Sequence, residues 1–184
     1  MALSTKLKPS FITQACDMDA LARWQQQISQ WYDTQSQSAD HPDSRMHDQV
    51  EALIPLIMHP PESLWGPDAT PEQGRALACW LDGCLRIYQS YLDEGRDMSA
   101  YQYLNFGYAK MQAIASDAMT DRVIKLWAIE RLDHLIVLVL ELCSRCHWLS
   151  ECETQVEGHI HFMAALHSVE LEEFRNDDQG ISDF

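Results

Sequence analysis

The chain has 184 residues, of which 46% are hydrophobic, and its formal net charge at pH 7 is −15. This length fits one domain, and this apolar content can form a core without disulfides or a metal. The charge disfavours nucleic acid and anionic membranes as partners, because both are negatively charged themselves. The longest apolar run is about six residues, far short of the roughly 20 in a membrane-spanning helix, so we expect no membrane segment.

The ends of the chain differ in composition from its middle. Residues 1–12 are expected to form a flexible lead, and residues 176–184 an acidic tail, around a single helical domain at 13–175. The lead contains Lys6 and Lys8 but no apolar segment typical of a secretory signal. The protein is therefore expected in the cytoplasm, where its six cysteines would be mostly reduced.

The first half of the domain contains three predicted helices. Apolar residues at spacings of three and four predict a helix at about 17–35, followed by a polar linker at 34–44. A second helix follows, and Pro55 should either kink it or mark its last turn. The third runs from about 71 to 93: Thr70, Pro71 and Gln73 form a predicted capping box, and Gly95 is placed to stop the helix. Gly74 and Gly83 within it predict close approach of another helix.

The second half of the domain contains three more. A fourth helix should start at Asp97 or Ser99, and a sixth at a capping box beginning with Ser150. Between them, residues 120–147 are apolar on nearly all sides and contain neither Gly nor Pro, which predicts a helix buried by its neighbours. The predicted fold is therefore all-α, an irregular bundle of about six helices around a buried central helix at about 121–146.

The end of this central helix carries a cysteine motif. Cys143, Cys146 and His147 match C-x-x-C-H, the attachment signature of c-type haem. With Cys152 the same residues offer four soft ligands, which is the requirement of a tetrahedral zinc site. The alternative interpretation is buried thiols that end a helix. We expect no cofactor, and a metal- or haem-binding helical protein is the second functional hypothesis.

A carboxylate and an imidazole also lie four residues apart. Glu130 and His134, beside Asp133, could hold a metal or act as a general-base pair, which is the third hypothesis, an enzyme or metal site. A di-iron bundle would need two Glu-x-x-His motifs, and the chain has neither. Pairing of Glu130 with Arg131 or His134 on a solvated helix face is the alternative.

Residues 130–135, Glu-Arg-Leu-Asp-His-Leu, resemble the Glu-Pro-x-Asp-His-Leu signature of the helical chaperones that mature bacterial molybdoenzymes. Arg131 stands where that signature has proline. Residues 53–65 are similar to an early segment of the nitrate-reductase members of that family. The resemblance covers a small part of the chain. It implies binding of a partner's signal peptide or apo-enzyme, with Asp133 and His134 near that site.

The leading hypothesis is a non-enzymatic cytoplasmic protein-interaction module, such as an adaptor, maturation chaperone, anti-regulator or immunity-type partner. The acidic surface favours a basic or apolar protein partner, and a homodimer stays an open alternative. The predicted partner-binding residues are aromatic side chains that the helical stripes leave exposed, together with two residues of the 130–135 motif: Trp65, Tyr103, Phe106, Trp148, Asp133 and His134.

Overall fold

The computed structural model describes residues 10–37, 42–66 and 70–179, and every regular element in these ranges is helical. The all-α prediction is confirmed. The elements, in chain order, are α1 (Ser10–Gln37), α2 (Pro42–Met58), the short 3-10 helix η1 (Glu62–Leu64), α3 (Pro71–Asp93), α4 (Asp97–Ser116), α5 (Arg122–Arg145) and α6 (Leu149–Gln179).

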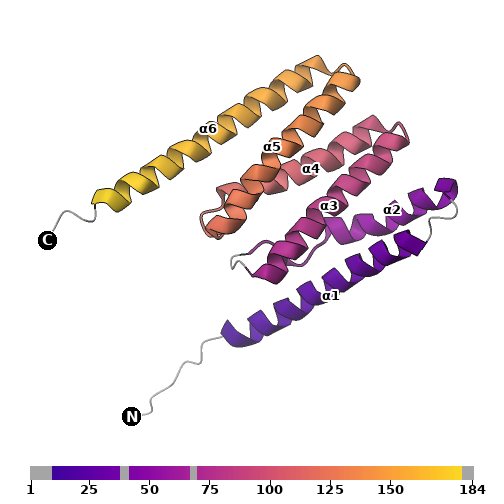
Figure 1. Ribbon diagram of the computed structural model, residues 1–184, viewed down its shortest axis with the longest axis horizontal. Helices are drawn as coiled ribbons and strands as arrows, with labels where there is room; N and C mark the ends of the chain where they lie inside the picture. The colour runs from indigo at the N-terminus through magenta and orange to yellow at the C-terminus, as the bar shows by residue number, and fades with distance from the viewer. Residues whose placement is uncertain (1–9, 38–41, 67–69, 180–184) are drawn as a thin grey trace, which may run out of the picture.

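The α-helices are arranged as successive antiparallel hairpins (Figure 1). Helices α1, α3 and α5 run in one direction, and α2, α4 and α6 run in the other. The most extensive packing joins α4 to α5 and α3 to α4, and α6 packs mainly on α5. The core therefore follows the middle of the row, while α1 and α6 each leave one side without a neighbouring helix.

The predicted helix ends are confirmed where local chemistry determines them. Thr70 caps α3, its side-chain oxygen accepting a hydrogen bond from the backbone N–H of Gln73. Asp121 caps α5 in the same way, accepting from Val123 N–H at 2.7 Å. Gly95 follows α3 with φ +71°, where a residue with a Cβ would be strained. The Gln73 side chain, however, donates to the Leu64 carbonyl, which ties α3 to η1.

Two tryptophans join α2 to its neighbours. Trp24 of α1 donates its indole N–H to the Leu56 carbonyl at 2.8 Å, and Trp80 of α3 donates to the Ile57 carbonyl at 2.9 Å. Both carbonyls lie in the last turn of α2, beside Pro55. A buried carbonyl at a helix end needs a hydrogen-bond donor. The two indole N–H groups supply these donors at the end of α2, while the indole rings fill the core.

Helix α5 is the predicted helix at 121–146, but its burial is one-sided. Its inner face, which includes Leu132, Leu135 and Val139, is buried in the core. Val123, Leu126 and Val137 are 71%, 45% and 51% exposed. The prediction of a buried central helix is confirmed for the inner face and its flanks. The remaining arc is exposed, because within the described chain the packing of α5 is almost entirely against α4 and α6.

The outer helices extend further than the sequence predicted. Helix α1 begins at Ser10, inside the predicted lead at 1–12, and α6 continues to Gln179, into the predicted tail. The rest of the lead and tail lies outside the described residues. Helix α6 begins at Leu149, so Ser150 is not its cap. Among the helices of the described ranges, none combines the length and apolar character that a bilayer-spanning segment needs.

Candidate functional site: the outer face of α5

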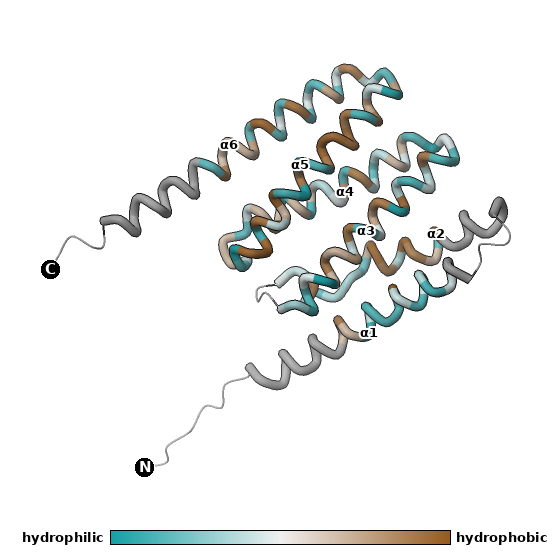
Figure 2. Tube along the Cα trace, in the orientation of Figure 1, coloured by the Kyte–Doolittle hydropathy of each residue, from teal (hydrophilic) through white to brown (hydrophobic). Residues whose placement is uncertain are grey.

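Most of the exposed residues of α5 form one continuous stripe. With 3.6 residues per turn, eight of its ten exposed residues fall within an arc of about 100°, and the exposed Arg122 and Arg145 flank this arc at the two ends of the helix. We call this stripe the outer face of α5, and it consists of Val123, Leu126, Glu130, Asp133, His134, Val137, Glu141 and Ser144. Figure 2 shows that the C-terminal half of α5 is strongly hydrophobic although the helix lies near the surface of the row.

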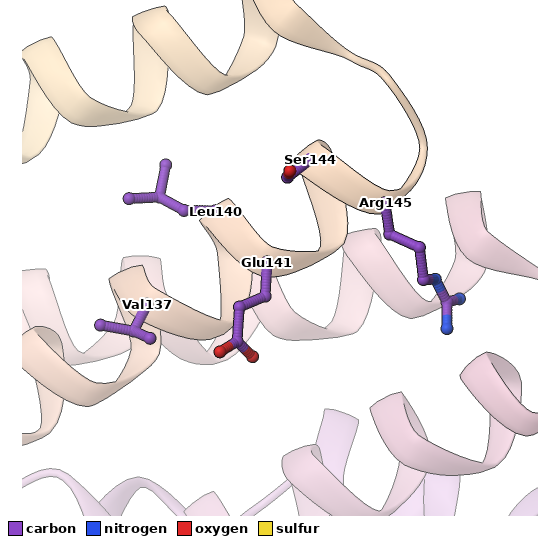
Figure 3. Close-up of a pocket in the computed structure, with 5 residues that line it drawn as sticks. All are labelled: Val137, Leu140, Glu141, Ser144 and Arg145. Atoms are coloured by element: carbon purple, nitrogen blue, oxygen red, sulfur yellow. The ribbon is translucent and has the colours of Figure 1, made fainter.

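A shallow groove of about 520 Å³ lies along the C-terminal half of this face. Its lining comes from α5: Val137, Leu140, Glu141, Ser144 and Arg145. Figure 3 shows Glu141 and Arg145 projecting from one side of the helix and Leu140 from the opposite side. Arg145 forms an ion pair with Asp97 at the start of α4, which holds its guanidinium at the edge of the groove.

The groove lies next to α3. Burial raises the pKa of the Tyr88 hydroxyl on α3. Two charges of the groove also reach this hydroxyl: that of Arg145 lowers its pKa, and that of Glu141 raises it. Tyr88 is itself buried. The groove therefore offers an apolar surface from Val137 and Leu140, with one carboxylate, and one guanidinium that already has a partner.

The carboxylates of the outer face are mostly unpaired. Among the described residues, neither Glu130 nor Glu141 makes a salt bridge or a side-chain hydrogen bond. Asp133 lies 3.5 Å from Nε2 of His159 on α6, and the Nδ1 of His159 lies 2.9 Å from the Tyr108 hydroxyl on α4. This chain of polar contacts joins α4, α5 and α6 behind the outer face, so the face is held on a fixed support.

The N-terminal end of the face is also well supported. In the turn before α5, the Asp117 carboxylate accepts hydrogen bonds from Met119 N–H and from the Thr120 hydroxyl, both at 3.0 Å. These bonds lower the pKa of Asp117. Thr120 is buried, whereas Met119 is 75% exposed and lies one turn before Val123. A rigid turn thus presents a large apolar side chain next to the outer face.

The predicted cysteine site is divided between core and surface. Cys143 is fully buried, Cys146 and Cys152 are half-buried, and His147 is exposed in the turn after α5, with φ +58°. Burial raises the pKa of the Cys143 and Cys146 thiols, which disfavours the thiolates that zinc requires. In the part of the chain that the structure describes, no three His, Cys, Asp or Glu side chains group to hold a metal.

Glu130 and His134 both lie on the outer face, but their side chains form no hydrogen bond or ion pair with each other. The Nδ1 of His134 is 2.9 Å from the backbone carbonyl of Glu130, a bond within the helix. Both side chains are exposed, and the groove lies further along α5. The 130–135 segment that resembles the molybdoenzyme chaperone signature lies within uninterrupted helix.

The predicted interface aromatics are less exposed than expected. All four are half-buried against the core: Trp65, Tyr103, Phe106 and Trp148. Trp65 packs edge-on against Trp80 with ring centroids 5.0 Å apart, and Trp148 does the same with Tyr101 at 5.6 Å. Helical spacing alone did not indicate these aromatic partners on other helices. The role of these residues in binding stays a prediction.

The sequence predicted a solvated helix face at Glu130 and His134, but the apolar residues that share this face were not among the predicted site residues. A usable signal was present in the charges. Glu130, Asp133, His134 and Glu141 all fall on the same arc of the helix, and that arc also contains Val123, Leu126 and Val137. Charged side chains identify the side of the helix that faces water, so their arc also located the apolar residues left uncovered.

Comparisons of the chain with protein-family models, with curated proteins and with solved structures found no match.

Proposed function

We propose that this protein is a non-enzymatic binding module that docks a partner protein on the outer face of α5. The observation that carries the proposal is the exposure of three large apolar side chains, Val123, Leu126 and Val137, on one arc of α5. Apolar side chains that gather on an exposed surface and are rimmed by polar residues are typical of protein interaction sites. Helices α4 and α6 cover one side, and a partner would cover the other.

The surrounding structure supports this proposal. The groove at Val137 and Glu141 is shallow and elongated along the helix, which suits a protein segment better than an enclosed small molecule. The polar contacts of Asp133, His159 and Tyr108 brace the face from behind. Because a preorganised surface loses little conformational entropy on binding, such bracing favours affinity. We place the module in the cytoplasm, since five of its six cysteines are free thiols: Cys79, Cys84, Cys143, Cys146 and Cys152.

Affinity capture with matched variants tests the proposal. The tagged protein is expressed in its native host and recovered with its partners, alongside Val137→Asp and the control Ala109→Asp. Both variants add one negative charge at an exposed helical position, the first on the outer face of α5 and the second on α4.

We expect Val137→Asp to lose a partner that both the wild type and Ala109→Asp retain, because a carboxylate would be buried in an apolar contact. Circular dichroism should show all three proteins folded. The proposal fails if the three proteins recover the same partners in the same amounts.

A further inference from the structure

We infer that the occupant of the outer face of α5 is a basic amphipathic helix of another protein. This inference rests on the proposed function and adds the chemistry of the partner. It starts from the order of side chains along the face: apolar at Val123 and Leu126, acidic at Glu130, apolar at Val137 and acidic at Glu141.

Between Val123 and Ser144 the charge on this face is of one sign. This stretch carries the carboxylates of Glu130, Asp133 and Glu141 and no exposed lysine or arginine. The exposed Arg122 and Arg145 lie at the two ends of α5, and Arg145 is already paired with Asp97. A partner that brings only apolar side chains would bury these carboxylates against nonpolar surface, which is costly. Lysine or arginine side chains beside Glu130 and Glu141 would remove that cost and add charge-assisted hydrogen bonds.

The spacing of the face suits a helix. Glu130 and Glu141 are 11 residues apart, or about 16 Å along the helix axis. Another helix packed alongside α5 presents side chains at the same rise per residue. Its apolar seam can therefore cover Leu126 and Val137 while basic residues three turns apart flank the seam. The shallow groove, whose lining residues follow α5 from Val137 to Arg145, offers this helix a surface that runs in the same direction.

A second copy of the same chain is a poorer occupant. Two outer faces packed together would place most carboxylates opposite carboxylates or apolar side chains, because the face offers no exposed lysine or arginine between Val123 and Ser144 to pair with them. Of the two arginines at the ends of α5, Arg145 is already paired with Asp97. Each copy would also bring a net charge of −15. The charges therefore favour a foreign basic partner over self-association.

The test uses three synthetic peptides of about 18 residues, or five helical turns. The first has a leucine seam flanked by lysines, the second has glutamate in place of each lysine, and the third is a scrambled form of the first with the same composition. Binding is measured by titration calorimetry and by amide chemical shifts of the isotope-labelled protein.

We expect the lysine peptide to bind and to shift the amides of α5 at 123–144. The glutamate and scrambled peptides should bind at least about tenfold more weakly. The double variant Glu130→Gln/Glu141→Gln should lose about tenfold in affinity for the lysine peptide. The matched double variant Glu153→Gln/Glu157→Gln, at exposed positions on α6 and with the same change in net charge, should change it less than about twofold.

The inference is overturned if the scrambled peptide binds as well as the ordered one, if both double variants weaken binding equally, or if the lysine peptide does not bind. It is also overturned if sedimentation shows a dimer in which the α5 amides are shifted. These outcomes are separable from failure of the proposed function. If partner capture depends on Val137 but the lysine peptide does not bind, the docking face stands and only the partner chemistry is wrong.

Discussion

At the scale of residues, two valines on α5 show how its exposed side differs from its buried side. Val137 is 51% exposed and Val139, two residues later, is fully buried, although both belong to the same apolar run. Replacement of either by alanine raises helix propensity equally. We expect Val139→Ala to lower the free energy of unfolding by about 2 kcal/mol and Val137→Ala to change it by less than about 0.5 kcal/mol.

Urea unfolding monitored by circular dichroism measures this difference as a shift in the transition midpoint at constant slope. Equal losses of stability in both variants would mean that α5 is enclosed on both sides in the monomer. That result would remove the observation on which the docking face depends.

At the scale of elements, a glycine on α3 determines how closely α2 approaches. A Cβ built on Gly83 would lie 2.3 Å from the Cδ1 of the buried Ile57, so Gly83 is where the two helices come together. A Cβ on Gly74 would meet nothing within 4 Å. The sequence predicted close approach at both glycines, and the prediction was correct at Gly83 and wrong at Gly74.

The two glycines should therefore respond in opposite directions to alanine. Gly83→Ala forces Ile57 out of its position and should cost about 1–3 kcal/mol of stability. Gly74→Ala relieves only the entropic cost of glycine in a helix and should add up to about 1 kcal/mol. Thermal melting of both variants tests this, and a stabilised Gly83→Ala would contradict the packing of α2 on α3.

The same contrast explains how much of each element the sequence could predict. Helix ends were predictable where a short-range signal determines them, as at Thr70 and Gly95, because capping depends on residues within one turn. Which side of α5 is covered follows from no such local signal, because it depends on which helices pack against it; only the arc of its charged residues indicated the uncovered side. The aromatic partners of Trp65 and Trp148 depend in turn on helices distant in the sequence.

At the scale of the whole molecule, all six tyrosines of the chain are held against the core. Burial is the main cause that raises the pKa of every one of them: Tyr32, Tyr88, Tyr91, Tyr101, Tyr103 and Tyr108. For Tyr101 the pKa rises to about 12, aided by its hydrogen bond to Glu151. Since tyrosine ionises at about pH 10 in an unfolded chain, only the unfolded state loses protons just above that pH.

The sign of the pH dependence follows from linkage. When the pKa of a tyrosine is raised in the folded state, its contribution to stability is fully present below about pH 10. This contribution is lost as the pH rises through the pKa of the tyrosine in the folded state. We expect the free energy of unfolding to fall as pH rises above about 10. Ultraviolet absorbance should also show tyrosinate forming at higher pH in the folded protein than in the unfolded chain. Ionisation of the folded protein at the same pH as the unfolded chain would mean that the tyrosines are open to water.

The central claim is that the outer face of α5 meets another protein in the cell, and site-specific photo-crosslinking tests it most directly. A benzophenone side chain is incorporated in place of Val137, or in place of Ala109 on α4 as the control, and cells of the native host are irradiated. We expect a covalent adduct between position 137 and a different protein, with little or none from position 109. No adduct at position 137, equal adducts at both positions, or an adduct only with a second copy of this chain would contradict it.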